Sequence, residues 1–339
     1  MLVLGIESSC DDTAAALVED GRKVLSSVVS SQEAIHARYG GVVPELASRA
    51  HIEAIVPVVE GALSSAGVSL DDIDGVAVTQ GPGLVGSILI GLSFAKSLSY
   101  VRGLPLTGVN HIEAHAHAAF LMDKGEDKEP PAFPFVALIV SGGHTTLLLF
   151  EDFTRYRILG QTLDDSAGEA LDKVAKLLGL GYPGGVAIDA LSREGSRDAI
   201  TFPRPLLGKG NLDFSFSGLK TAMLTYVKGL KALPVDGLLA DLSASFQESV
   251  VDVLVTKALW AVEATGARNL VVAGGVASNS RFRESLQAIA LEKGLKLFIP
   301  PPGFCTDNAA MVASLGYRQL GAGKLAGLDL NAKPTWEGF

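Results

Sequence analysis

Two stretches of the sequence, LVLGIESSCDDTAAALV at residues 2–18 and FVALIVSGGHTTLLLF at residues 135–150, follow one pattern. In each, a short apolar run is followed by a polar turn, residues 7–13 or 141–146, and then by a second apolar run. Short apolar runs bounded by small polar residues are typical of buried strands. Because the pattern occurs once in each half of the chain, it predicts two similar lobes that face a cleft.

The other apolar runs of the sequence, at residues 76–78, 270–273 and 295–299, alternate with long alanine-rich segments. Strands that alternate with helices indicate an α/β fold. Helices are predicted at residues 44–66, 86–100, 242–264, 280–293 and 308–320.

The composition describes a core-rich globular protein. Of the 339 residues, 48% are hydrophobic and only 19% are charged, and the formal net charge is −9. Nucleic-acid binders usually have a net positive charge, so a nucleic-acid partner would need a local basic patch or another subunit.

Two cysteines give no disulfide framework and favour a reducing cytoplasm. The uncharged stretch at residues 75–95 is better explained as a strand, a glycine turn and a buried helix than as a membrane span.

The hexapeptide NHIEAH at residues 110–115 contains two histidines four residues apart. In a helix this spacing sets His111 and His115 about 40° apart on one face and about 6 Å apart along the axis. Two imidazoles in this arrangement can reach one metal ion, although a buried pair with ordinary hydrogen bonds fits the same pattern. We therefore predict a helix capped by Asn110, with a candidate metal site on it.

Asp307 precedes the predicted final helix and follows the proline-rich residues 300–302. An aspartate at this position can cap the helix. Its carboxylate could instead join the two histidines, because two imidazoles and a carboxylate with open positions suit Fe(II) or Zn(II). The sequence alone leaves both roles open.

Three glycine turns are candidates for binding an anion through backbone N–H groups. Each could be an ordinary tight turn, but three of them with two lobes predict a nucleotide site. Asn279, in the segment after the last turn, is placed to hydrogen-bond the ligand. The turns are Ser141-Gly142-Gly143, Gly184-Gly185 and Gly274-Gly275.

Two carboxylates of the second half are candidates for binding ligand hydroxyl groups. Asp172 lies within a helix predicted over residues 164–178, whose first acidic residues also suit the positive end of the helix dipole. Asp189 follows the Gly184-Gly185 turn.

With these residues in place, the chain resembles the bacterial tRNA N6-adenosine threonylcarbamoyltransferase family of the TsaD type. The likeness covers nearly the whole chain, and the resemblance implies the two-lobed α/β fold of the actin, sugar-kinase and Hsp70 ATPase (ASKHA) superfamily, built around a central cleft. Besides NHIEAH, the matching motifs are GIESSCD at 5–11, PELASR at 44–49, QGPG at 80–83, VSGGHT at 140–145, FSFSGLKT at 214–221, AGGVA at 273–277 and CTDN at 305–308.

The resemblance implies a reaction and the residues that serve it. The reaction is metal-assisted transfer of threonylcarbamoyl from threonylcarbamoyl-AMP to N6 of the adenosine 3′-adjacent to the anticodon, in tRNAs that read codons starting with A. One divalent metal per subunit, with Fe(II) favoured and Zn(II) as the alternative, is implied at His111, His115 and Asp307. The adenylate is implied at Ile139, Val140, Ser141, Gly142, Gly143, Asp172, Gly185, Asp189 and Asn279.

The domain division expected from these observations has four parts. Residues 1–123 form an N-terminal lobe with the metal-binding helix, and the charged, proline-rich residues 124–134 form a linker. Residues 135–305 form a C-terminal lobe with the nucleotide site. Residues 306–339 form the final helix and a tail that returns to the N-terminal lobe.

The resemblance also implies partners and leaves two alternative functions. The partners are tRNA, a paralogous ASKHA-fold subunit of the TsaB type and a P-loop ATPase of the TsaE type. The first alternative is a metallopeptidase. In His-Glu-x-x-His enzymes the glutamate directly follows the first ligand, whereas Glu113 lies about 200° from His111 around the helix. The second alternative is a non-catalytic nucleotide-binding scaffold, which would not need metal ligands.

Overall fold

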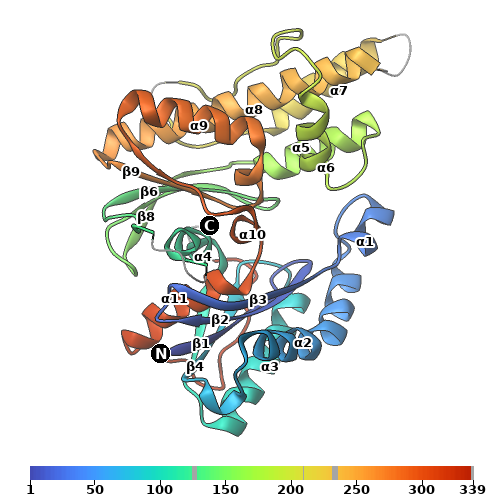
Figure 1. The fold of residues 1–339 in the computed structure, drawn as a ribbon. Coiled ribbons are helices and arrows are strands. Elements are labelled where there is room, and N and C mark those ends of the chain that lie inside the picture. The colour runs from blue at the N-terminus through green and yellow to red at the C-terminus, as the bar shows by residue number, and fades with distance from the viewer. Residues whose placement is uncertain (124–127, 209, 231–235, 337–339) are drawn as a thin grey trace. The chain divides into compact units, whose positions relative to one another are not determined.

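A computed structural model describes residues 1–123, 128–208, 210–230 and 236–336, so residues 124–127 of the expected linker lie outside the described residues. The chain divides into two compact units, residues 1–131 with 300–339 and residues 132–299, which we call the first and the second unit. Each unit contains a five-stranded sheet with helices packed on it (Figure 1). The predicted α/β class is therefore confirmed.

The two sheets have the same topology. The strand orders are β3-β2-β1-β4-β5 in the first unit and β8-β7-β6-β9-β10 in the second. In both sheets the first three strands along the chain pair antiparallel with their neighbours. The fourth strand pairs parallel with the first, and the fifth pairs parallel with the fourth. The repeat seen in the sequence is therefore a repeat of a whole sheet, with β1 equivalent to β6 and β2 equivalent to β7.

The elements of the first unit begin with three consecutive strands. They are β1 (Leu2–Glu7), β2 (Asp12–Glu19), β3 (Lys23–Ser31), α1 (Glu33–His36), α2 (Pro44–Ala66), β4 (Gly75–Gly81), α3 (Val85–Arg102), β5 (Leu106–Asn110), α4 (His111–His117), α10 (Pro302–Cys305) and α11 (Ala309–Gly321), with 3-10 turns at Ala37–Tyr39, Leu70–Asp72 and Ala118–Phe120.

The elements of the second unit also begin with three consecutive strands. They are β6 (Phe135–Val140), β7 (Thr145–Phe150), β8 (Tyr156–Gln161), α5 (Ala167–Leu178), α6 (Gly184–Ser192), α7 (Ser217–Gly229), α8 (Asp236–Thr265), β9 (Asn269–Ala273), a 3-10 turn at Gly275–Ser278, α9 (Ser280–Lys293) and β10 (Lys296–Phe298).

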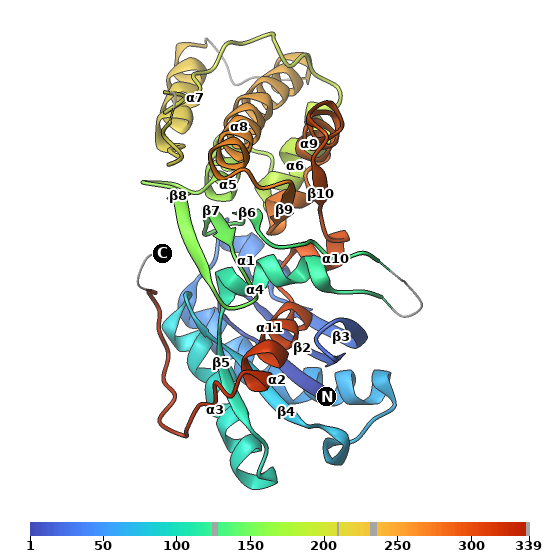
Figure 2. The same ribbon diagram turned by 90° about the vertical axis from the view of Figure 1, so that its left-hand side faces the viewer.

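Helices cover both faces of the sheet in the first unit. Alternate residues of a strand point to opposite faces, and in β1 the residues on both faces are apolar. Leu4 and Ile6 of β1 pack with apolar residues of α2 and α3, while Val3 packs with residues of α11. Gly5, on the face of Val3, has no room for a side chain, since a Cβ there would meet the Ala309 carbonyl oxygen and Ala313. This close approach fixes the start of α11 against the sheet (Figure 2 shows α11 beside α4 and β5).

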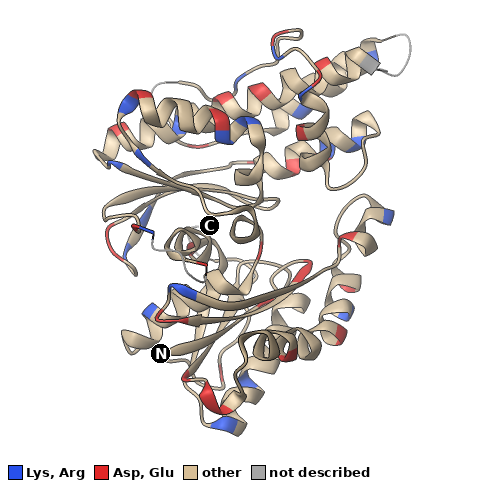
Figure 3. Ribbon diagram, viewed as in Figure 1, with Lys and Arg blue, Asp and Glu red and all other residues tan. Residues whose placement is uncertain are grey.

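Charged residues are concentrated on the helices and connecting segments, and the central strands carry few of them (Figure 3). This distribution follows from burial, since the central strands β1, β4, β6 and β9 are almost completely buried. Among the helices of the described residues, none combines the length and the apolar character needed to cross a bilayer. The uncharged stretch at residues 75–95 forms β4 and the first part of α3, as predicted.

One helix begins later than predicted. The helix expected over residues 164–178 begins at Ala167, because Ser166 is its cap and accepts a hydrogen bond from Glu169 N–H. The Asp164 carboxylate accepts hydrogen bonds from Phe216 N–H, Ser217 Oγ and Ser215 Oγ. Asp164 therefore stabilises the start of α7, and its expected place in the first turn of the earlier helix is wrong.

Candidate metal centre and nucleotide site

The candidate residues of both units lie where parallel strands end. In the first unit β1, β4 and β5 are parallel, and they end at Glu7, Gly81 and Asn110. In the second unit β6 and β9 are parallel and run into Ser141 and Gly274. The carboxyl edge of parallel strands is the usual place for ligand sites in open α/β sheets, because loops from neighbouring strands meet there.

The predicted helix with two histidines is α4. The Asn110 side-chain oxygen caps it by accepting hydrogen bonds from the N–H groups of Ile112 (2.8 Å) and Glu113 (3.0 Å). The His111 and His115 rings lie on one face, with their centroids 4.7 Å apart and their planes 82° apart. Both side chains are buried. The cap and the spacing therefore present two imidazoles together, as predicted.

Asp307 joins the two histidines from the other end of the chain. Its Oδ1 lies 3.5 Å from His111 Nε2 and 3.2 Å from His115 Nε2. The potential ligand atoms of the three residues all lie within 4.8 Å of one another. Capping of α11 falls instead to Asn308, whose side chain accepts a hydrogen bond from Met311 N–H. Of the two roles left open for Asp307, the structure supports the possible metal site.

Glu7 is a further site residue, to which the sequence analysis gave no role. Its fully buried carboxylate lies 2.9 Å from His111 Nδ1 and accepts hydrogen bonds from Thr79 Oγ1 (2.6 Å) and from Ser9 N–H. An ionised carboxylate can only accept, so Nδ1 of His111 donates and Nε2 is left to face Asp307. The sequence did contain a signal for this role, because Glu7 directly follows an apolar run that predicts a buried strand. A carboxylate in such a place is rarely buried unless it has a partner.

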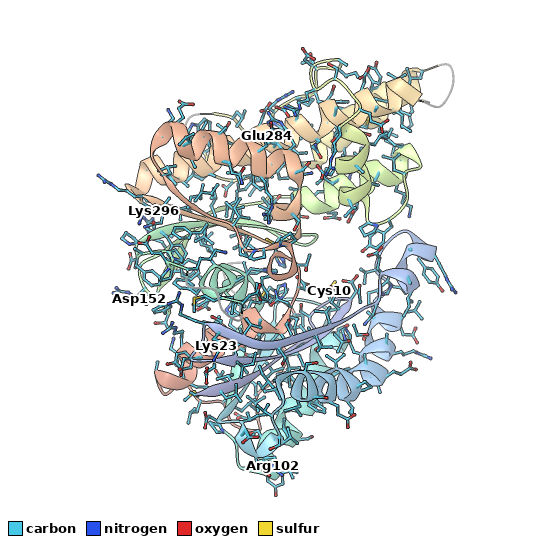
Figure 4. The ribbon with its side chains drawn as sticks, viewed as in Figure 1. Cys10, Lys23, Arg102, Asp152, Glu284 and Lys296 are labelled. Carbon is cyan, nitrogen blue, oxygen red and sulfur yellow. The ribbon has the colours of Figure 1, made fainter. Side chains whose placement is uncertain are left out.

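The turn that carries Ser9 and Cys10 is held in place by a buried histidine of α2. His51 Nε2 donates to the Cys10 carbonyl oxygen (3.0 Å), and His51 Nδ1 accepts from Thr13 Oγ1 (2.7 Å). Cys10 lies in the turn after β1 and is labelled in Figure 4. Ser9 Oγ in turn lies 3.3 Å from His111 Nδ1. The polar turn seen in the sequence therefore supports the candidate metal site from behind.

The charges around the site affect its two histidines in opposite directions. At His111, burial favours the neutral ring, but the Glu7 and Asp307 carboxylates outweigh it and raise the pKa to about 9. At His115, burial dominates and lowers the pKa. At Glu7, burial disfavours the carboxylate, yet the adjacent His111 lowers its pKa overall. His115 is consequently held in the neutral form that binds a metal.

The donor set fits a divalent metal ion. Both ring nitrogens of His115 are buried and have no aligned hydrogen-bond partner in the described part of the chain, although Nε2 is close to Asp307. An unpartnered polar atom in the interior costs free energy, which coordination would offset. The Glu7–His111 contact is the carboxylate–histidine arrangement that orients metal-binding imidazoles.

In the second unit, the Ser141-Gly142-Gly143 turn follows β6 as predicted. Ser141 N–H donates to the His144 carbonyl oxygen (2.8 Å), which closes the turn. Gly142 and Gly143 are exposed, and a Cβ on either would meet nothing within 4 Å. Ile139 and Val140, which the resemblance also implied, are fully buried within β6. Open space for a ligand is therefore found at the two glycines.

Asp172 and the Gly184-Gly185 turn lie together. Asp172 Oδ1 accepts hydrogen bonds from the N–H groups of Gly184 (2.8 Å) and Gly185 (3.2 Å), the first two residues of α6. A Cβ on Gly184 would lie 2.6 Å from the Asp172 Cα, so only glycine fits at this contact. Asp172 thus stabilises the amino end of α6 in this structure.

Asp189 and Asn279 meet at the amino end of α9. Asn279 caps this helix by accepting a hydrogen bond from Phe282 N–H (2.9 Å). The Asp189 carboxylate accepts from Ser280 Oγ (2.7 Å) and from Ser280 N–H. Both residues, predicted separately, therefore converge on one helix end.

Comparison with known proteins identifies the family. The model of the TsaD family, tRNA N6-adenosine threonylcarbamoyltransferase, matches residues 23–314. Proteins of this name from Geobacter sp. (strain M21) and Pelobacter propionicus are each 58% identical to the chain over 99% of its length. The matched region spans 96% of the Geobacter protein and 97% of the Pelobacter protein.

Two solved structures share the fold at low sequence identity. Full-length HypF, in its phosphate- and nucleotide-bound form, has a TM-score of 0.61 and 16% identity over 94% of this chain and 56% of its own. Component A of the (R)-2-hydroxyglutaryl-CoA dehydratase of Acidaminococcus fermentans has a TM-score of 0.53 and 16% identity over 95% of this chain and 99% of its own. These likenesses show that the chain shares the fold of both proteins. The family match and the 58% identity over nearly the full length show that the chain belongs to the tRNA N6-adenosine threonylcarbamoyltransferase family.

Proposed function

We propose that the chain transfers threonylcarbamoyl from threonylcarbamoyl-AMP to N6 of the adenosine 3′-adjacent to the anticodon, in tRNAs that read codons starting with A. Membership of the family, with relatives of this name at 58% identity, supports the transferase activity on tRNA. The observation that carries the chemical site is the convergence of His111, His115 and Asp307 within 4.8 Å.

One divalent metal ion is proposed at these three residues, with Fe(II) favoured and Zn(II) as the alternative. Two imidazoles and one carboxylate are a donor set that suits either ion. When bound, the ion would supply Lewis acidity and hold an oxygen of the phosphate or carbamoyl group. Glu7 would hold the proton on Nδ1 of His111, so that Nε2 is the nitrogen that would bind the ion once its own proton has left.

The adenylate is proposed to bind in the second unit, at the residues that the resemblance implied. Ser141 N–H is already engaged in its turn, so we assign the N–H groups of Gly142 and Gly143 to the phosphate. The amine of adenosine attacks the carbamoyl carbon, the C–O bond to AMP breaks, and AMP leaves with the electron pair as the amine loses a proton. Backbone N–H groups at the phosphate would stabilise the charge of the departing AMP.

The position of the buried carboxylates argues against a metallopeptidase. Such an enzyme needs a carboxylate that can reach a metal-bound water. Glu7 contacts His111 at Nδ1, the nitrogen on the other edge of the ring from Asp307. Glu113 lies about 200° from His111 around the helix, so it points away from the face that carries the two histidines. Burial raises its pKa to about 7, against the opposing charge of Lys324.

Two protein partners and a compartment complete the proposal. A paralogous ASKHA-fold subunit of the TsaB type and a P-loop ATPase of the TsaE type are expected to assist the reaction. The chain is expected to work in the reducing cytoplasm, and Cys10 and Cys305 are not joined in a disulfide in the structure.

The decisive experiment is reconstitution. Protein purified without oxygen is analysed for iron and zinc, then incubated with tRNA, threonylcarbamoyl-AMP and the candidate partners. Digestion of the tRNA and nucleoside analysis should reveal N6-threonylcarbamoyladenosine. A parallel incubation with unfolded protein substrates tests the peptidase alternative. Peptide cleavage without nucleoside modification would contradict the proposal.

A further inference from the structure

We propose that Gln247 is a positioning residue for the nucleotide site, because it fixes the direction in which the Asn279 amide points. The inference rests on the proposed function, in which Asn279 binds the adenylate. Gln247 lies in the middle of α8, and its side chain is 4% exposed.

The hydrogen bonds of Gln247 join three helices. Its Oε1 accepts from Asn279 Nδ2 at the start of α9 (2.7 Å). Its Nε2 donates to Ser192 Oγ at the end of α6 (2.7 Å). Gln247 therefore links α6, which carries Asp189, to the cap of α9. Because its side chain is buried, we expect it to act on a ligand through Asn279 and not by direct contact.

The direction of each bond in this chain is determined. Phe282 N–H must donate, so the Asn279 atom that receives it is Oδ1 and the amide nitrogen faces Gln247. Ser192 Oγ–H donates to the Asp189 carbonyl oxygen (2.9 Å), so Ser192 must accept from Gln247. The order Phe282, Asn279, Gln247, Ser192, Asp189 runs from donor to acceptor at every step.

This order leaves one defined group for a ligand. An amide nitrogen carries two hydrogens, and Gln247 receives one of them. The second hydrogen of Asn279 Nδ2 is held in a fixed direction as a donor. The Asp189 carboxylate accepts hydrogen bonds from Ser280, the residue after Asn279, and from Arg193 Nη2 (3.2 Å). Without the Gln247 oxygen, the Asn279 amide nitrogen would lose the partner that orients it.

The test compares two substitutions of the same size. Gln247→Glu keeps an oxygen opposite Asn279, while Gln247→Met removes both hydrogen bonds. We expect Gln247→Met to raise the KM for threonylcarbamoyl-AMP and the Kd for AMP by about tenfold, with kcat and metal content unchanged. This factor corresponds to losing one hydrogen bond between the Asn279 amide and the ligand. Gln247→Glu should retain most of the affinity. Ser243→Ala is the matched control, since its hydroxyl donates to the Leu239 carbonyl oxygen within the same helix.

A double-mutant cycle separates positioning from general stability. Asn279→Ser keeps an oxygen to cap α9 but removes the amide. Adding Gln247→Met to Asn279→Ser should then cause no further loss of AMP affinity, because the group that Gln247 orients is absent. Additive losses, or an equal loss in Gln247→Glu and Gln247→Met, would overturn the inference. Failure of the wild-type protein to bind AMP or modify tRNA would instead contradict the proposed function itself.

Discussion

The two candidate sites lie at the same edge of equivalent sheets, but they differ in what else their side chains do. In the first unit, Asn110 and Asn308 cap the helices, and each stands directly beside a candidate metal ligand. In the second unit the candidate ligand residues do this work themselves: Asn279 caps α9, and Asp172 accepts hydrogen bonds from the first N–H groups of α6. The difference implies that a metal ligand can be replaced with little effect on the helix ends, whereas replacing Asp172 or Asn279 by a residue without a side-chain acceptor would loosen the start of α6 or α9.

The largest effect that tests this comparison is expected at the metal ligands. His111→Ala should reduce metal affinity by more than about 100-fold and abolish transfer, since ligand loss exceeds the effect of outer partners. Helical content should remain, because the cap of α4 is Asn110. Metal analysis, circular dichroism and nucleoside analysis measure the three quantities. His117→Ala, on the same helix but outside the cluster, should retain the metal. Full occupancy in His111→Ala would contradict the assignment.

The next effect concerns the carboxylate behind His111. Glu7→Gln should weaken metal binding by about 10- to 100-fold, because the neutral amide no longer supports the Nδ1 proton of His111 as strongly. Competition with a chelator of known affinity measures the change. Thr79→Val, which removes one donor to Glu7 but leaves the carboxylate, should have a smaller effect. Unchanged affinity in Glu7→Gln would show that Glu7 is only a structural anion.

A smaller effect tests the second unit. Asn279→Ala should lower the free energy of unfolding by about 1 kcal/mol relative to Asn279→Ser, because only serine can still cap α9. Both variants should bind AMP more weakly than the wild type. Denaturant unfolding with AMP titration distinguishes the two contributions. Equal stability of the two variants would mean that capping and ligand binding are separable here as well.

The smallest effect depends on pH. Arg281 of α9 forms a bidentate pair with Glu248 of α8 (both distances 2.6 Å) and also contacts Glu284, labelled in Figure 4. The hydrogen bonds from Arg281 outweigh burial and lower the pKa of Glu248. The stabilisation is therefore present above the ordinary pKa of 4.5 and disappears as the pH falls through the lowered value.

Replacing that glutamate provides the measurement. Glu248→Gln should cost about 1 kcal/mol at pH 7 and progressively less below pH about 4.5, where the wild-type carboxylate also becomes neutral. Urea unfolding across this range gives the difference between the two proteins. A difference that does not shrink in acid would mean that packing, and not charge, accounts for the loss.

Several features could be read from local sequence because they depend on neighbours in the chain. The strand and turn pattern at residues 2–18 and 135–150 gave the repeated sheet, and the Asn110 cap with histidines four residues apart gave α4. The start of α5 was misplaced, since the choice between Asp164 and Ser166 depends on a distant partner. Asp164 is bonded to residues 215–217, which no local pattern relates to it.

The sequence by itself determined the fold class, the two histidines on one helix face and the family, because periodicity, capping and motif spacing are properties of short segments. Only the tertiary structure decided that Asp307 faces those histidines while Asn308 caps α11, and that Glu7 is buried behind His111. It also decided that Gln247 joins Ser192 to Asn279. These contacts link residues from distant parts of the chain, and they depend on close packing such as that of α11 against Gly5, which a linear pattern does not encode.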